Sequence, residues 1–412
     1  MVKQLLVISF FLTAINAHGI SILIPMDEIQ KQHLKAYGIA YHTLQKDIAV
    51  DWLLNYRGGS FLIDYSKAIE SECKIRGVSY EIKNDAEVNS ILNLISSPAQ
   101  NMNLVRMEKE PRVAVYSPKG DLIQDETDAV ILVLNFAEIP YDIIYDEEII
   151  NDALLKYDWL HLHHEDFTGQ ISKGQYRQSA IIESKLNQIR ATNLGYEKVS
   201  QMKFDVVKRI EAFLAGGGYL FAMCSGAETF DIALAAEGKD IEDSFYDGGT
   251  IYLDFEISLA FENFDLFSPD DRSFSDINIG RGWGGNDNGY FTLYDYSAKW
   301  DIIPSLLTQN HENVIREFTG LTTAFNKSLV KPTVEVLAES KTKPEVRYIY
   351  GEFGKGHWTY YSGHDPEGSR NRGGGRGGSR TTDLNLYPNS PGYRLILNNV
   401  LFPSASKKKR KT

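Results

Sequence analysis

One of the two cysteines of the chain stands between an apolar segment and a helical pattern. Residues 216–230 read GGGYLFAMCSGAETF, so Cys224 follows the apolar run YLFAM and precedes small residues. A nucleophile on a sharp strand-to-helix turn needs small neighbours, because the backbone there is crowded and strained. The amides that begin the following helix would lower the pKa of the thiol and favour the thiolate. The competing interpretation is a small core residue, since unpaired cysteine is among the most buried residue types.

A second group of side chains that could take part in catalysis or metal binding lies at the end of another apolar segment. Residues 157–170 read YDWLHLHHEDFTGQ, and this segment contains His161, His163, His164, Glu165 and Asp166. Alternation along a strand puts His161 and His163 on one face. One interpretation is a site for a divalent metal or for proton transfer, because imidazoles and carboxylates do both. The other is a hydrogen-bonded polar cluster that shapes a ligand pocket. No ligand spacing here is diagnostic, so we assign no cofactor and keep a divalent metal as an alternative.

The elements that must position these groups alternate between strand and helix patterns. From Arg112 onward, short apolar runs such as RVAVYSP and YLFAM are separated by amphipathic segments. Continuous apolar strands alternating with helices predict a parallel sheet that is covered on both faces. The predicted class is α/β, with a doubly wound, mostly parallel sheet. In such sheets ligands bind beyond the carboxyl ends of the strands, which is where Cys224 and the histidines fall.

Changes in composition and in the predicted elements divide the chain into regions. We expect an N-terminal α/β region over residues 18–110 and a main domain over residues 111–402. An irregular insertion at about 238–330, rich in Asp, Gly, Ser and aromatic residues, would interrupt the main domain, with a helix over residues 310–321. Residues 403–412 carry the run KKKRK and read as a basic disordered tail.

The first residues have the pattern of a secretory signal. Lys3 is followed by LLVISFFLTAI and then Asn16-Ala17, which predicts a signal peptide over residues 1–17 and an exported, periplasmic or extracellular protein. Its apolar core is shorter than the roughly 20 residues of a membrane span. We therefore expect no integral membrane segment after signal removal.

Charge and cysteine content exclude other classes. The formal net charge of −12 disfavours nucleic acid as a partner. Two cysteines, Cys73 and Cys224, make neither a disulfide framework nor a cysteine-based zinc cluster. Arg57, followed by two glycines, is a secondary candidate for binding an anion, although a simple strand-ending turn explains the same residues.

Two motifs resemble a known superfamily. The segment around Cys224 resembles the nucleophile elbow of the class I glutamine amidotransferase-like superfamily. Residues 350–367, YGEFGKGHWTYYSGHDPE, are similar to the late part of that fold, where a Gly-Lys-Gly hairpin leads into the strand that carries the catalytic histidine. The Gly-His-Asp at 363–365 is closest to the trehalose-utilisation (ThuA-like) branch. The resemblance covers roughly residues 110–402. It implies a flavodoxin-like sheet of amidotransferase type, with Cys224 as nucleophile, His364 as base and Glu367 as the acid that orients the imidazole.

The sequence also departs from that pattern. Two residues separate His364 from Glu367 where amidotransferases have one, which leaves Asp365 or a distant carboxylate as an alternative orienting acid. Glu228 stands where glutaminases usually carry glutamine, and the histidine-rich strand end takes the place of their Gly-Gly oxyanion loop. These departures argue against glutamine hydrolysis more than against the fold.

The whole chain also resembles exported bacterial proteins that are often labelled asparagine synthetase B. Asparagine synthesis is not expected, because Val2 follows Met1 where a catalytic cysteine is needed and no Ser-Gly-Gly-x-Asp loop for ATP is present. The sequence instead predicts an exported cysteine-dependent hydrolase, or an acyl- or amido-transferase-like enzyme, of unknown substrate. The alternative is a non-catalytic protein of the same fold that binds a carbohydrate or another small ligand.

Overall fold

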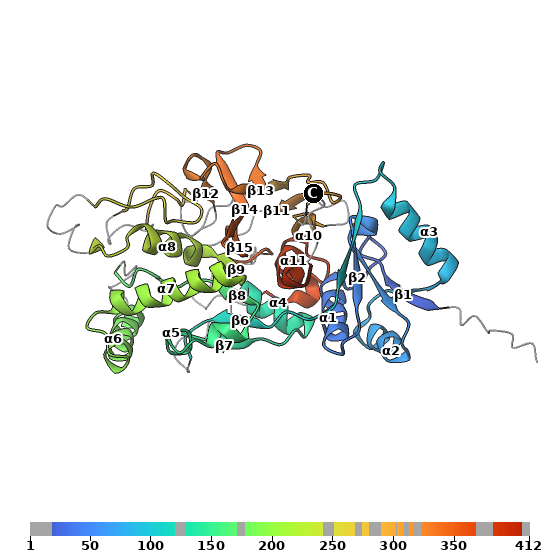
Figure 1. The fold of residues 1–412 in the computed structure, drawn as a ribbon, viewed down its shortest axis with the longest axis horizontal. Coiled ribbons are helices and arrows are strands. Elements are labelled where there is room, and N and C mark those ends of the chain that lie inside the picture. Colours follow the sequence, from blue (N-terminus) through green and yellow to red (C-terminus); the bar gives the residue numbers. More distant parts are fainter. Residues whose placement is uncertain are drawn as a thin grey trace, which may run out of the picture.

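The computed structural model describes most of the chain. It covers residues 19–119, 128–170, 178–241, 251–267, 274–279, 290–301, 303–308, 313–316, 324–367 and 382–405. The predicted signal peptide and residues 406–412 of the predicted basic tail lie outside these ranges. The predicted tail is wrong at residues 403–405, which form the end of the last helix, Pro391–Ala405. Figure 1 shows the described elements arranged around two sheets.

The N-terminal region forms a sheet of its own. The strand order is β4-β1-β3-β2-β5, and every pairing is antiparallel. The strands are β1 (Ile20–Ile24), β2 (Val50–Leu54), β3 (Ser60–Asp64), β4 (Glu81–Asn84) and β5 (Asn103–Met107). The helices are α1 (His33–Leu44), α2 (Lys67–Arg76) and α3 (Asp85–Ser96). The alternating pattern of this region therefore does not produce parallel pairing. A short connection with the 3-10 turn η1 (Tyr56–Gly58) returns β2 directly into β3, and such a connection forces antiparallel strands.

The larger sheet is mixed. One part is parallel and contains, in spatial order, β15 (Gly356–Tyr361), β9 (Tyr219–Met223), β8 (Trp159–Leu162), β6 (Val113–Tyr116) and β7 (Asp142–Ile144). The other part is antiparallel and contains β14 (Glu345–Phe353), β13 (Glu335–Ser340), β10 (Tyr290–Leu293) and β11 (Val314–Arg316), with β12 (Phe325–Asn326) paired to β14. The α/β class is confirmed, whereas "mostly parallel" holds only for the first part.

The predicted insertion belongs in part to this sheet. Residues from about 238 to 330 supply β10, β11 and β12 to the antiparallel part, together with the short helix α10 (Pro304–Leu307). The helix predicted over residues 310–321 is wrong at 314–316, which form β11 and pair with β10. Pairing with a distant strand overrides the local helical pattern there.

Helices cover both faces of the parallel strands. Within β6, Val113 and Val115 join one core with residues of α1, α4 (Ala129–Ala137) and α11 (Pro391–Ala405). Ala114 and Tyr116 join a second core with residues of α7 (Val199–Gly216) and α8 (Cys224–Ala235). The remaining helical elements are α5 (Asp146–Ile150), α6 (Gln178–Asn193), η2 (Ala153–Lys156), η3 (Lys327–Leu329) and η4 (Leu384–Leu386). No helix in the described ranges is long and apolar enough to cross a membrane.

A buried arginine of α11 joins the N-terminal region to the rest of the molecule. Arg394 is fully buried, and its guanidinium donates to the Met26 carbonyl oxygen at 3.2 Å, to the Tyr37 hydroxyl at 3.0 Å and to the Gly58 carbonyl oxygen. Nearby, the backbone amide of His33 donates to Asn389 Oδ1 at 3.0 Å. The helix α1 and the segments that follow β1 and β2 are therefore tied to the last helix of the chain.

The buried imidazole of His33 predicts acid sensitivity of this junction. Burial, reinforced by the charge of Arg394, lowers the pKa of His33 to about 4. The unfolded chain binds this proton as the pH falls below about 6.5, whereas the folded chain does so only near pH 4. The contribution of the neutral His33 to the free energy of unfolding is therefore fully present above pH 6.5. It is expected to fall by roughly 3 kcal/mol between pH 6.5 and 4.

Urea denaturation at several pH values measures this effect. His33→Gln should show a shallower decline than the parent protein between pH 6.5 and 4. His42→Gln, on the same helix, is the matched control and should keep the parent slope. An unchanged slope in His33→Gln would show that this imidazole does not cause the acid sensitivity.

Candidate functional site

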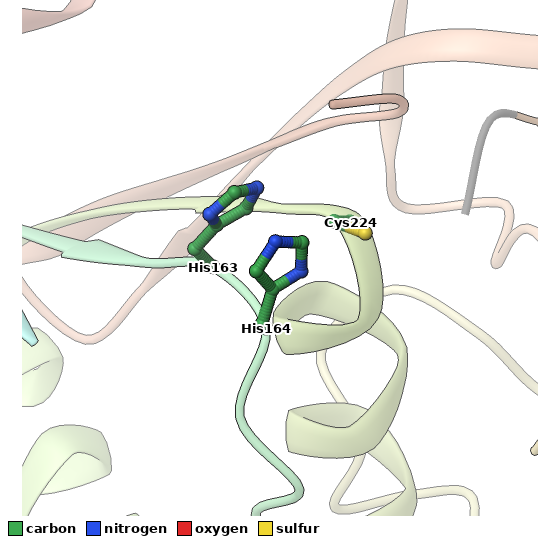
Figure 2. Close-up of side chains that lie close together, drawn as sticks. All are labelled: His163, His164 and Cys224. Carbon is green, nitrogen blue, oxygen red and sulfur yellow. The ribbon is translucent and has the colours of Figure 1, made fainter. Parts of the chain in front are cut away.

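The predicted site residues meet at the carboxyl ends of neighbouring parallel strands. Cys224 follows β9 directly, and His163 and His164 follow β8. His364 follows β15, the neighbour of β9 on its other side. Figure 2 shows the two imidazoles of His163 and His164 at the end of β8, beside Cys224 at the beginning of α8.

Cys224 occupies a strained turn. It is the first residue of α8, with no residue between the helix and the end of β9, and its φ angle is 52°. A positive φ is uncommon for a residue with a side chain and persists where the surroundings enforce it. The side chain is 0% exposed. The sharp strand-to-helix turn expected from the sequence is therefore present, and its thiol is buried.

Hydrogen bonds fasten the histidine-bearing loop to the first turns of α8. The Gly226 amide donates to the His163 carbonyl oxygen at 2.5 Å, and the Ser225 hydroxyl donates to that of His164 at 3.0 Å. The Thr229 hydroxyl donates to the Glu165 carbonyl oxygen at 2.6 Å. The backbone of the loop is thereby held at the start of the helix, and its imidazoles are held beside Cys224.

Three imidazoles pack together at this point. The rings of His163 and His164 stack with centroids 3.6 Å apart. The ring of His364 lies 4.7 Å from that of His163 and 4.6 Å from that of His164. One nitrogen each of His163 and His164 and the sulfur of Cys224 lie within 4.8 Å of one another. His164 and His364 are half-buried, so the cluster meets solvent on their side.

A buried carboxylate supports the cluster from behind. Asp128 caps α4, where its Oδ1 accepts from the amides of Val130 at 2.7 Å and Ile131 at 3.2 Å. Its Oδ2 lies 3.1 Å from Nε2 of His161 and 3.2 Å from Nδ1 of His163. Asp128, His161 and His163 form a second group of atoms close enough to hold an ion. The other ring nitrogen of His161 lies 3.1 Å from the Phe221 carbonyl oxygen.

Burial and contacts decide the protonation states of Asp128 and His163. Burial opposes the charge of Asp128, but the neighbouring imidazoles of His161 and His163 outweigh it and hold the pKa of Asp128 well below its usual range. Burial, followed by the charge of His164, lowers the pKa of His163 to about 3. Near neutral pH, a carboxylate therefore faces a neutral His163 imidazole, whose Nδ1–H can donate to it.

Two of the predicted ligand residues have other contacts. Glu165 accepts from the Tyr145 hydroxyl at 3.0 Å and lies 3.8 Å from Nζ of the buried Lys203. Asp166 accepts from the amide of Thr168 at 2.9 Å and from its hydroxyl at 2.5 Å, which closes a local turn. In the described part of the chain, neither carboxylate belongs to a group of atoms close enough to share an ion.

The acids that follow His364 lie on a turn against α11. Asp365 Oδ1 accepts from the Tyr393 hydroxyl at 2.8 Å and from the Glu367 amide at 3.0 Å, and Oδ2 accepts from the Thr382 hydroxyl. Both oxygens of Asp365 therefore help to hold this turn. The role of Glu367 as the acid that orients His364 stays a prediction.

The remaining candidates, Glu228 and Arg57, have partners within the fold. Glu228 is buried in α8 and accepts from the Ser275 hydroxyl at 2.7 Å, which attaches the segment 274–279 to this helix. Arg57 lies in the N-terminal region, where its guanidinium contacts Asp27 at 2.6 Å and Glu81 at 2.8 Å. Both carboxylates balance the charge of Arg57 within the turn after β2, and its role in anion binding stays a prediction.

Asp128 is a site residue that the sequence patterns do not reveal. An aspartate directly before the apolar run AVILVLNFA is a signal for a helix N-cap. Its second role depends on His161 and His163, which lie more than thirty residues further along the chain. That pairing has no local sequence signature.

Known proteins give little further information. No family model and no curated protein matches this chain. The solved structure of a cytoplasmic protein, STM3548, from Salmonella typhimurium is 8% identical, with a TM-score of 0.33 over 61% of this chain and 87% of that chain. A beta-galactosidase from Bacillus circulans sp. alkalophilus is 15% identical, with a TM-score of 0.27 over 63% of this chain and 29% of that chain. These scores are too low to support a fold or a function.

Proposed function

We propose that the protein is an exported cysteine-dependent hydrolase, or an acyl-transferring enzyme, that acts on a small molecule. One observation carries this proposal: the strained φ of 52° at Cys224 sets its sulfur within 4.8 Å of ring nitrogens of His163 and His164. A thiol beside an imidazole at the start of a helix is the arrangement that activates a cysteine nucleophile. The signal pattern over residues 1–17 supports export.

The order of the parallel strands supports the resemblance to the amidotransferase-like superfamily. Numbered along the chain, β6, β7, β8, β9 and β15 lie in the spatial order 2-1-3-4-5. This is the order of flavodoxin-like sheets, in which ligands bind beyond the carboxyl ends of the strands. Cys224 and His364 follow the adjacent strands β9 and β15, as the resemblance implies for a nucleophile and its base.

The proposed reaction needs a nucleophile, a base and an oxyanion site. An imidazole of the cluster takes the thiol proton, and the sulfur attacks the acyl carbon of the substrate. The bond to the leaving group breaks as the imidazolium returns the proton to it, which leaves a thioester. Water then attacks the thioester and regenerates the thiol. Amides in the first turn of α8 lack intrahelical acceptors, so the Ser225 amide could stabilise the oxyanion.

Alkylation of the two cysteines tests the proposal without a known substrate. Cys73 serves as the reference for an unreactive thiol, because burial and the charge of Glu72 raise its pKa to about 12. Its alkylation rate is measured in a Cys224→Ala protein. In a Cys73→Ala protein freed of metal by a chelator, we expect iodoacetamide to modify Cys224 on the order of tenfold faster than a free thiol at pH 7. His164→Gln and His364→Gln each remove one half-buried imidazole. The variant that slows the modification identifies the base.

A binding protein without catalysis is the second candidate. The complete burial of Cys224 favours it, because a core cysteine is inert. In that case Cys224 would react no faster than Cys73 does in a Cys224→Ala protein, and neither histidine variant would change its rate. That result would refute the proposal that the protein is a cysteine-dependent enzyme.

A further inference from the structure

We propose that His163, His164 and Cys224 bind one zinc ion. Their ligand atoms already lie within 4.8 Å of one another, and two imidazoles with a thiolate are donors that zinc prefers. Bound at ordinary zinc distances, such donors are separated by about 3.3–3.7 Å. Closing the site around the ion therefore needs the donors to approach by about 1–1.5 Å and the stacked rings of His163 and His164 to turn so that both point a nitrogen at it.

The surroundings of His163 match those of a zinc-bound histidine. A metal-bound imidazole usually donates its other N–H to a carboxylate, which fixes the tautomer and the ring orientation. Nδ1 of His163 lies 3.2 Å from Asp128 Oδ2, and this arrangement suits Nε2 as the donor to the metal. Asp128 is itself fixed by the amides at the start of α4. Asp128 therefore lies where the outer-shell partner of a zinc-bound His163 is needed.

The backbone also holds the three donors in place. His163 and His164 are fastened to α8 through their carbonyl oxygens, and Cys224 is the first residue of that helix. Three protein donors leave the fourth tetrahedral position for water, as in zinc sites that remain open to a substrate. The ring of His364 packs against both imidazole donors and so lies beside the metal.

Binding and release of zinc would switch the nucleophilicity of Cys224 off and on. A zinc-bound sulfur has lost much of its charge, so it cannot attack an acyl carbon while the ion is bound. This consequence rests on the proposed function. Metal binding does not, because the donor set would bind zinc whether or not Cys224 is a nucleophile. We therefore expect zinc to protect Cys224 from alkylation.

Cobalt spectroscopy of the full chain tests the metal site. After treatment with a chelator, one equivalent of Co²⁺ should produce a thiolate-to-cobalt charge-transfer band and the visible bands of tetrahedral cobalt, and Zn²⁺ should displace both. Cys224→Ser should abolish the charge-transfer band. His164→Ala, which changes a half-buried side chain, should weaken Zn²⁺ binding at least about tenfold. Cys73→Ala and His42→Ala are the matched controls and should bind as the parent protein does.

The two proposals fail separately. Absence of the charge-transfer band in the parent protein, or unchanged binding in both Cys224→Ser and His164→Ala, would overturn the zinc site. Slow alkylation of Cys224 in the metal-free protein would overturn the cysteine enzyme and leave the cobalt result intact.

Discussion

Replacement of Asp128 by alanine is expected to lower the free energy of unfolding by about 3–5 kcal/mol. The carboxylate is almost completely buried and has four close partners: two helix amides on Oδ1, and His161 and His163 on Oδ2. Its loss leaves the start of α4 uncapped and removes the acceptor that both imidazoles face. Each of these defects leaves buried polar groups unsatisfied, and that penalty exceeds the value of the hydrogen bonds themselves.

Two variants separate the contributions of Asp128 in urea denaturation. Asp128→Asn keeps an oxygen for the helix cap and loses the charge that faces the imidazoles, so its loss of stability should be intermediate. Ser66→Ala removes only a cap, since Ser66 accepts from the Ala68 amide at the start of α2, and should cost about 1 kcal/mol. If Asp128→Ala costs no more than Ser66→Ala, the carboxylate does not support the imidazoles energetically.

Gly226→Ala is expected to destabilise the protein by about 2–3 kcal/mol and to change the reactivity of Cys224. A Cβ at residue 226 would lie 2.5 Å from the His163 carbonyl oxygen and 3.0 Å from its carbonyl carbon. These are backbone atoms held by hydrogen bonds to α8, so the loop must move away as a unit. That movement separates His163 and His164 from the thiol. Urea denaturation and the rate of Cys224 alkylation measure the two effects.

Gly216→Ala is the matched control for Gly226→Ala. Gly216 is also in a helix, at the end of α7, but a Cβ there would have no neighbour within 4 Å. Helix propensity alone favours alanine over glycine by up to about 1 kcal/mol, so Gly216→Ala should be neutral or stabilising. Equal effects of the two substitutions would contradict the close packing of the loop against α8.

Local patterns predicted the elements that carry the site. Apolar runs followed by small or polar residues gave β8 and β9 and the residues beyond their ends. Strands of one parallel layer end at the same edge, so chain order alone predicts that Cys224 and the histidines lie near each other. The Gly-Lys-Gly hairpin is explained by close packing. A Cβ at Gly356 would collide with the backbone oxygens of Leu214 and Gly218 at the end of α7.

Other features depend on contacts that the linear pattern does not show. β3 follows β2 after the tight turn of Tyr56–Gly58. The same turn makes the N-terminal sheet antiparallel. Glu165 and Asp166 share the segment of the histidines, yet Tyr145 and Thr168 engage them. The packing of the fold decides which residue donates a hydrogen bond to each carboxylate, and a linear pattern does not encode this packing.

The sequence by itself determined the strands and helices around the site, from β6 to α8, the cysteine at a strand-to-helix junction and the group of histidines at a strand end. These features follow from periodicity, small residues and chain order, which act over a few residues. Only the tertiary structure decided that His364 packs on His163 and His164, that Asp128 supports two imidazoles and that part of the insertion completes the sheet. The physical reason is that these contacts join segments far apart in the chain, and their energies depend on burial and distance.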